Sequence, residues 1–306
     1  MGNSRNAPDE RVVYLALENV FKGPNAEPIA LSPGVLTMAK HSDSRPRAGK
    51  KRIATGEGRG KETEQYRVTK RQRRGKTTAR NRGLGAAPAG LNGEQKAKIH
   101  EVISKYGDPP LKGLVDDQWA PGKVVLAHIL NALLSSTRIS HNIAIHTLEC
   151  LLDAGYNDID VLRHTSWAAR VNLLDSGGYV RYDEKTARYL GELRKLLTHK
   201  YDDDASKVLP TGLQGEEART TLSTRLQEVK GIGPVGTTIF FGSIQHFFPG
   251  IAPFLDPRSL KTAAQIGLGS DVDAIFAALG HSTSEMAKLE VALTKIRLEK
   301  REKEFE

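Results

Sequence analysis

The chain has 306 residues, 39% of them hydrophobic, and a formal net charge of +9 at neutral pH. This length allows one large domain or two small ones, and the low apolar fraction suggests that part of the chain does not pack. Cys150 is the only cysteine, which excludes an intramolecular disulfide, an iron–sulfur cluster and a cysteine-rich zinc site held within this chain. No apolar run reaches roughly 18 residues, so we expect no transmembrane helix and no membrane partner.

The positive charge is concentrated in the N-terminal third. Residues 1–93 hold 19 Lys and Arg against 8 Asp and Glu, whereas the remainder holds 26 against 28. We therefore expect residues 1–92 to form a disordered basic tail and linker. The clusters at 50–52 and 70–76 are typical of nuclear signals or phosphate contacts. A tail that is merely solvated is the alternative interpretation.

Residues 93–306 are expected to form the folded domain. Asn92 or Gly93 is the predicted N-cap of the first helix, and the sequence Gly107-Asp108-Pro109-Pro110 is expected to end that helix. Apolar residues recur at helical spacing through the rest of the chain, and no run shows the period-two alternation of a strand. The predicted helices are 93–106, 121–134, 140–154, 158–164, 166–174, 182–200, 216–229, 235–248, 257–266, 272–279 and 283–304. The predicted fold class is all-α.

The segment Leu226–Gly236 (LQEVKGIGPVG) predicts a helix end, a Gly-x-Gly turn and a new helix start. Gly231 and Gly233 can adopt backbone angles closed to other residues and let a phosphate approach the main chain. A helix that starts near Pro234 points its free N–H groups and the positive end of its dipole at that phosphate. This pattern favours a sequence-independent grip on a DNA backbone, with an ordinary helix turn as the alternative.

Asp256 is the second candidate element, and it lies 21 residues after Val235 in the segment Ile251–Leu260 (IAPFLDPRSL). An Asp between an apolar lead-in and a helix is an ordinary N-cap. In the functional interpretation, the carboxylate faces a flipped nucleotide. Breaking an N-glycosidic bond builds positive charge on the sugar, and an ionised carboxylate stabilises that charge and orients the attacking water. Both interpretations can hold together.

Taken together, these elements resemble the helix-hairpin-helix DNA glycosylases of the endonuclease III superfamily, in which L-P-G-V-G-x-K-T-A is followed by V-D-T-H. Leu126–Thr137 (LAHILNALLSST) is similar to that family's early buried helix, which ends in L-L-S-A-Q. Gly177–Ala187 is similar to its G-x-Y-x-x-K-A stretch, and the resemblance covers roughly Leu114–Arg297. It implies two helical subdomains with a helix-hairpin-helix motif and a cleft between them, into which a damaged base of duplex DNA turns for base-excision repair.

Three departures from the family pattern qualify this expectation. Val235 stands where bifunctional members carry a catalytic lysine, so the resemblance implies a monofunctional hydrolase without lyase activity, unless Lys230 or Lys261 substitutes. The four-cysteine cluster loop of many members is absent. The glutamine that often fills the gap left by the flipped base is replaced by Thr137, which is short for that task, although a neighbouring apolar wedge can plug such a gap.

The resulting hypothesis is a DNA N-glycosylase that acts in the nucleus as a monomer on double-stranded DNA, without metal or organic cofactor. Asp256 is its predicted catalytic residue. The predicted DNA-binding residues are Lys230, Gly231, Ile232, Gly233, Val235, Arg181, Lys185 and Arg258. The main alternative is a non-catalytic DNA-binding protein that keeps the hairpin. A protein-interaction scaffold without DNA affinity is the third possibility.

Overall fold

The computed structural model describes residues 90–305, and all regular structure in this range is helical, as the sequence predicted. The α-helices are α2 (Gly93–Tyr106), α3 (Pro121–Ser135), α4 (His141–Asp153), α5 (Ile159–His164), α6 (Trp167–Ser176), α7 (Asp183–Tyr201), α8 (Gly215–Gln227), α9 (Pro234–Ile244), α10 (Pro257–Gln265), α11 (Val272–Ala278) and α12 (Thr283–Glu299). Three short 3-10 helices complete the set: η1 (Ala205–Val208), η2 (Pro249–Ile251) and η3 (Glu302–Phe305). The predicted basic tail up to residue 89 lies outside the described residues.

Side-chain caps explain where many of the helices begin. At α2, the Asn92 side chain accepts the backbone N–H of Gln95 at 2.7 Å, and the Gln95 side chain accepts the backbone N–H of Asn92 at 3.0 Å. This reciprocal capping box satisfies two donors that the helix itself leaves unpaired. The predicted start of the first helix is therefore confirmed.

Two helices end four or five residues before their predicted ends, and the other ends agree within about two residues. The helix expected over 235–248 ends at Ile244. Pro249 disfavours helical backbone at Phe248, whose φ is −120°, and such local restrictions end helices early. The helix expected over 283–304 ends at Glu299, because Lys300 adopts a left-handed backbone with φ of 59°. The η3 turn follows and buries Phe305.

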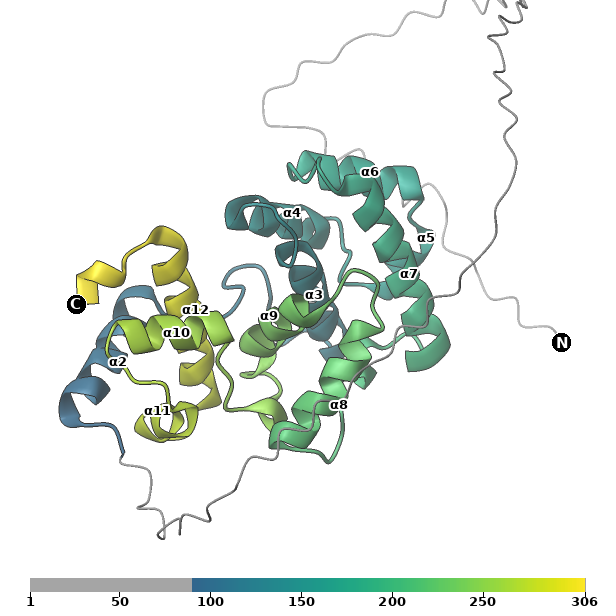
Figure 1. Cartoon of the computed structure of the whole chain (residues 1–306). Coiled ribbons are helices and arrows are strands. Elements are labelled where there is room, and N and C mark those ends of the chain that lie inside the picture. The colour runs from purple at the N-terminus through teal and green to yellow at the C-terminus, as the bar shows by residue number, and fades with distance from the viewer. Residues whose placement is uncertain (1–89, 306) are drawn as a thin grey trace, which may run out of the picture. The chain divides into compact units, whose positions relative to one another are not determined.

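The first subdomain packs the helices between α3 and α9 around α3 itself. Every residue from Val124 to Leu134 is buried, because this stretch is apolar on nearly all sides and only a central position can hide it. The helix packs against α4, α9 and η1 (Figure 1). Burying each such Leu or Ile stabilises the fold by about 1.5–3 kcal/mol, so this core anchors the elements around it.

The second subdomain has its own core, made by α2, α10, α11 and α12. Helix α2 precedes the first subdomain in the chain and the other three helices follow it, so the chain leaves this subdomain and returns to it (Figure 1). Helix α12 packs against α2 and α10, and it also contacts α9 of the first subdomain. Two helical subdomains are therefore present, as the sequence predicted. Among residues 90–305, no helix has the length and apolar character needed to cross a bilayer.

Candidate nucleic-acid interface

The turn between α8 and α9 forms the predicted helix-hairpin-helix motif. Val229 and Ile232 bury their side chains in the first core, and the Ile232 N–H donates to the Val229 carbonyl at 3.0 Å. Ile232 was predicted to contact DNA, but its side chain is only 5% exposed. It therefore anchors the turn, while Lys230 and Gly231, which lie between Val229 and Ile232, are exposed.

The two glycines of the turn have different roles. Gly231 has a φ of +95°, and a Cβ there would lie 2.6 Å from Tyr189 and 2.7 Å from Leu133. Both the backbone angle and the space therefore require glycine. Gly233 has a φ of −114°, which other residues adopt, and a Cβ there would meet nothing within 4 Å. The space in front of Gly233 is open to an approaching group.

The first turn of α9 leaves its backbone donors unpaired by any side-chain cap. Pro234 occupies the first helical position and lacks an N–H, so the free donors belong to the residues that follow, Val235 and Gly236. Val235 is 48% exposed. This end of the helix therefore offers N–H groups and a positive dipole end to an anion.

A basic pocket of about 370 Å³ lies beside the hairpin. It combines the end of α3, the start of α7 with the preceding loop, and the hairpin turn. Its lining residues are Leu133, Ser136, Thr137, Arg138, Arg181, Tyr182, Lys185, Thr186, Tyr189 and Gly231. The predicted residues Arg181, Lys185 and Gly231 are thus brought together. All of the lining belongs to the first subdomain, so this pocket is not the cleft between subdomains that the sequence analysis expected.

The cations of this pocket are available to a ligand. Arg138, Arg181 and Lys185 line it, Lys230 is adjacent to Gly231, and none of the four forms an ion pair within residues 90–305. Among residues 90–305, no carboxylate lines the pocket, although Asp183 and Glu184 lie between Arg181 and Lys185 in the chain. Unpaired cations attract phosphate groups.

The wall behind these cations is rigid. Tyr179 is fully buried and donates its hydroxyl to the Leu134 carbonyl at 3.0 Å. The Thr137 hydroxyl lies 2.7 Å from the Tyr179 hydroxyl and 3.1 Å from the Leu134 carbonyl. Thr137, which occupies the gap-filling position of the family pattern, is therefore tied into the pocket wall.

Arg138 and Val180 were not predicted as site residues, and both side chains are more exposed to a ligand than that of Thr137. Arg138 is exposed directly after Thr137, and Val180 is 63% exposed directly before Arg181. A single exposed apolar side chain is ordinary on a protein surface, so Val180 is a candidate contact only because it directly precedes the pocket cation Arg181. Val180 could have been found from its place between Tyr179 and Arg181, because an apolar residue in a loop has no core position to fill.

Asp256 is the N-cap of α10 and its side chain accepts the backbone N–H of Arg258 at 2.7 Å. The Arg258 guanidinium also pairs with this carboxylate, with Nε 3.0 Å from Oδ1 and Nη2 3.1 Å from Oδ2. Asp256 is only 3% exposed, whereas the Arg258 side chain is 48% exposed. The structure therefore places the predicted DNA contact Arg258 over the predicted catalytic residue.

The electrostatics of this site keep Asp256 ionised. Burial alone would raise the pKa of its carboxyl group, but hydrogen bonds from Arg258 and from Thr238 outweigh burial and hold the pKa below its ordinary value. Thr238 lies in the first turns of α9, and its single hydroxyl proton has two acceptors within reach, the Asp256 carboxylate and the Val235 carbonyl at 3.0 Å. The carboxylate of Asp256 therefore lies beside the same end of α9 that carries the open donors of the hairpin.

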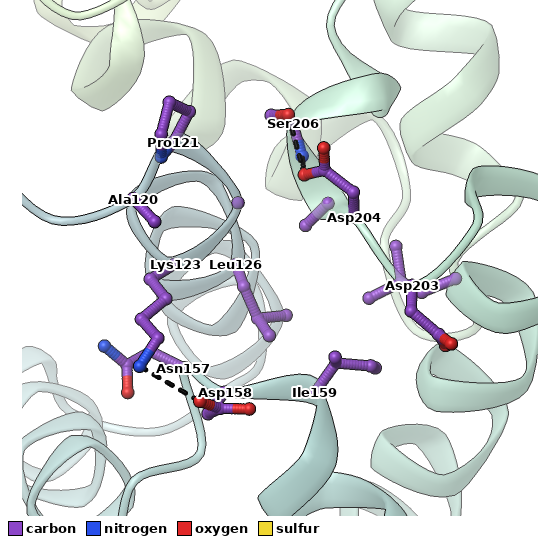
Figure 2. A pocket seen from close by; sticks show the side chains of 13 residues that line it. Ala120, Pro121, Lys123, Leu126, Asn157, Asp158, Ile159, Asp203, Asp204 and Ser206 are labelled. Atoms are coloured by element: carbon purple, nitrogen blue, oxygen red, sulfur yellow. Dashed lines mark hydrogen bonds and ion pairs between the residues drawn. The ribbon is translucent and has the colours of Figure 1, made fainter. Parts of the chain in front are cut away.

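A second pocket, of about 310 Å³, lies at the other end of α3 (Figure 2). Its charged side chains already have partners. Lys123 pairs with Asp158 at 3.0 Å, and Asp204 caps η1 by accepting the N–H of Ser206 at 2.9 Å. About 15 Å of helix separates Lys123 from Leu133 of the basic pocket, given a rise of 1.5 Å per residue. This pocket is therefore separate from the hairpin site.

His128 and His246 of the first core each have one ring nitrogen with a side-chain partner and one without a partner among residues 90–305. His128 is fully buried, and its Nδ1 lies 3.0 Å from the hydroxyl of Ser243. Burial and the neighbouring His246 lower the pKa of His128 to about 3, so this ring is neutral at physiological pH. Among residues 90–305, no group of three or more His, Cys, Asp or Glu side chains is arranged to hold a metal ion.

Comparison with protein-family models, with curated proteins and with solved structures finds no match to this chain.

Proposed function

We propose that this protein is a monofunctional DNA N-glycosylase, which binds damaged duplex DNA and hydrolyses the glycosidic bond of a flipped base. One observation carries the proposal: the ionised carboxylate of Asp256 lies beside Thr238, on the helix whose N-terminus forms the hairpin. A group suited to stabilising a cationic sugar is thus held next to a group suited to holding the phosphate of the same strand.

Binding begins with the hairpin and the basic pocket. The N–H groups at the start of α9 take one phosphate, and the absence of a side chain at Gly233 lets that phosphate come close. Arg138, Arg181 and Lys185 hold the backbone beside it. Val180 inserts into the base stack and occupies the space that the extruded base leaves, because apolar wedges of this kind stabilise unstacked steps. The basic segment 1–92 adds affinity that depends on salt.

Chemistry then depends on Asp256. Departure of the base leaves positive charge on the sugar, which a nearby carboxylate stabilises more strongly in a site that excludes water. The lowered pKa of Asp256 suits this electrostatic role, because the group is negative at neutral pH. The exposed Val235 offers no amine, so the product is an abasic site without strand cleavage.

The same geometry also supports the alternative, a DNA-binding protein without catalysis. Asp256 is 3% exposed and its oxygens are occupied by Arg258, as a purely structural cap would be. For catalysis, Arg258 must swing away, and its half-exposed side chain has room to do so. A phosphate that attracts the guanidinium would uncover the carboxylate.

The test is base release from duplexes that contain uracil, alkylated, oxidised or mismatched bases, measured as abasic sites cleaved by alkali. We expect release by the wild-type chain from at least one duplex, and none by Asp256→Asn, with DNA affinity nearly unchanged. If the wild-type chain releases no base from the whole panel, the enzyme hypothesis fails, and retained affinity would favour the non-catalytic alternative.

Asp271 supplies a matched control, because it is the N-cap of α11 and accepts the N–H groups of Asp273 and Ala274 at 3.0 Å each. Asp271→Asn removes the charge of a comparable cap, and replacing a good cap costs about 1 kcal/mol at most for such a mild change. Base release should persist in this variant. Equal loss in both variants would mean that Asp256 acts only as a cap.

A further inference from the structure

The N-terminus of α10 lacks a partner that its own sequence would normally supply. In a capping box, the side chain three residues after the N-cap accepts the backbone N–H of the N-cap residue, as Gln95 does for Asn92 at α2. At α10 that position is Ser259, whose hydroxyl donates to Glu290 at 2.7 Å. The N–H of Asp256 therefore needs an acceptor from elsewhere in the chain.

Glu290 of α12 is that acceptor. Its Oε2 accepts the backbone N–H of Asp256 at 3.0 Å, while its Oε1 accepts the Ser259 hydroxyl. Gly242 of α9 leaves the space for this side chain, since a Cβ at Gly242 would lie 2.8 Å from Cγ of Glu290. Helices α9, α10 and α12 thus meet at one carboxyl group directly behind Asp256.

This arrangement is costly for stability alone. Glu290 is only 8% exposed, and buried ionisable groups are often replaced by apolar residues without loss of stability. Burial raises the pKa of Glu290 to about 8, against the opposing hydrogen bonds from Ser259 and the Asp256 N–H. The charged groups that face it are Asp256 and Arg258 of α10 and Arg297 of α12, and α9 contributes the uncharged Gly242.

We propose that Glu290 is a positioning residue, which fixes the main chain of Asp256 and thereby aims its carboxylate at the first turns of α9. The contacts of Glu290 with the Asp256 N–H and the Ser259 hydroxyl are independent of function, whereas the effect on catalysis rests on the proposed glycosylase activity. A small displacement of a catalytic carboxylate lowers turnover more than binding, because the DNA is held by other groups. Glu290 therefore affects kcat and leaves the grip on DNA intact.

The experiment compares Glu290→Gln and Glu290→Ala with Glu285→Gln. Glu285 lies on the same helix and pairs with Lys288 at 2.8 Å, away from α10. The glutamine amide keeps an acceptor for the Asp256 N–H and offers donors to the hydroxyls of Ser259 and of Thr294, which lies 3.4 Å from Oε1 of Glu290, whereas alanine offers neither. The first measurement uses the backbone amide NMR signal of Asp256. Its chemical shift is recorded as a function of pH, and its rate of hydrogen exchange is measured.

In the wild-type chain, we expect the chemical shift of the Asp256 amide to change as Glu290 titrates, at a pH well above the ordinary pKa of a glutamate. Glu290→Gln should abolish this change. Exchange of this amide should rise about tenfold or more in Glu290→Ala and stay near the wild-type rate in Glu290→Gln. The control variant should behave as wild type in both measurements. An Asp256 amide whose titration persists in Glu290→Gln, or whose exchange rate is unchanged in Glu290→Ala, overturns the proposal.

The second measurement is base release. We expect kcat to fall about tenfold to a hundredfold in Glu290→Ala, with KM within about twofold of wild type, and Glu290→Gln to recover most of the loss. A uniform rise in KM without loss of kcat would contradict a positioning role. If the wild-type chain releases no base, the glycosylase proposal fails, and the amide signal still decides whether Glu290 holds Asp256. If Glu290→Ala does not fold, the titration in Glu290→Gln decides.

Discussion

The guanidinium of Arg258 covers the carboxylate of Asp256 with two parallel contacts, 3.0 Å and 3.1 Å long, between residues only two positions apart in the chain. Paired contacts of this kind are stronger and more directional than single ones. They hold Asp256 ionised and shielded at the same time. Access to this carboxylate is therefore controlled by the position of one half-exposed arginine side chain.

Arg258→Ala should raise the pKa of Asp256, because burial raises this pKa and the substitution removes the guanidinium that lowers it. A carboxyl group with a depressed pKa in the folded state stabilises the protein above its unfolded pKa, and this contribution is lost as pH falls through the folded value. The wild-type chain should thus lose stability below about pH 4, and the variant should lose less. Since Arg258 is half exposed, solvent screening limits the difference to about 1 kcal/mol.

The measurement is the free energy of unfolding by urea at pH 7 and at pH 3. Lys288→Ala is the control, since it removes another ion pair of similar length, with Glu285, outside the Asp256 site. This control should keep the wild-type dependence on pH. An Arg258→Ala variant with the same dependence as wild type would show that the pair does not set the pKa of Asp256.

The two hairpin glycines should respond to alanine in opposite ways. Gly231→Ala places a Cβ in contact with Tyr189 and Leu133 on a left-handed backbone, which should cost about 2 kcal/mol or more. Gly233→Ala meets no neighbour and should change stability by less than about 0.5 kcal/mol. Its methyl group nevertheless occupies the approach path of a phosphate, so DNA affinity should fall. Urea unfolding and a DNA titration separate the two effects, and unchanged affinity in Gly233→Ala would remove the hairpin from the DNA interface.

Val235→Lys should confer lyase activity on the proposed enzyme. Val235 is 48% exposed, so the substitution should be tolerated, and it supplies an amine one helical turn from Thr238 and hence near Asp256. Borohydride reduction should trap a covalent complex with DNA for this variant but not for wild type. Val235→Met, which is similar in size and lacks the amine, is the control. Trapping by the wild-type chain would show that another lysine acts.

Deletion of residues 1–90 should flatten the dependence of DNA binding on salt. Each phosphate contact contributes about 0.9 to the slope of log affinity against log salt, so even a few contacts from the basic clusters are measurable. The comparison uses undamaged duplex DNA over a range of salt concentrations. An unchanged slope would exclude the N-terminal segment from binding.

Much of the fold follows from local sequence. The apolar density of 124–134 predicts a central helix, and α3 is buried along that whole stretch. Asp256 before Pro257 predicts an N-cap, which the structure confirms. These features depend on neighbours in the chain, where periodicity and capping chemistry are informative. The predicted helix ends at 248 and 304 were wrong, because the helices end at Ile244 and Glu299. Pro249 and the left-handed Lys300 restrict the backbone beyond these points.

The candidate site is less accessible to sequence reasoning, because its partners come from distant parts of the chain. Glu290 is 34 residues from Asp256 and carries no local signal, since a glutamate on a charged helix predicts a solvated face. Arg138 joins Arg181 and Gly231 only through the packing of α3 against the hairpin. The two glycines look equivalent in the sequence, and only their backbone angles show that Gly231 alone requires glycine.

The path of the chain through the two subdomains has a consequence for assembly. Lys98 of α2 donates to the Phe305 carbonyl at 2.8 Å, so the second core closes only when segments about 200 residues apart meet. The first core uses one continuous stretch of chain and can form before that closure, since long loops close slowly. The hairpin belongs to the early core and Asp256 to the late one. If the proposed function holds, the folding chain would therefore complete its DNA-binding surface before its catalytic centre.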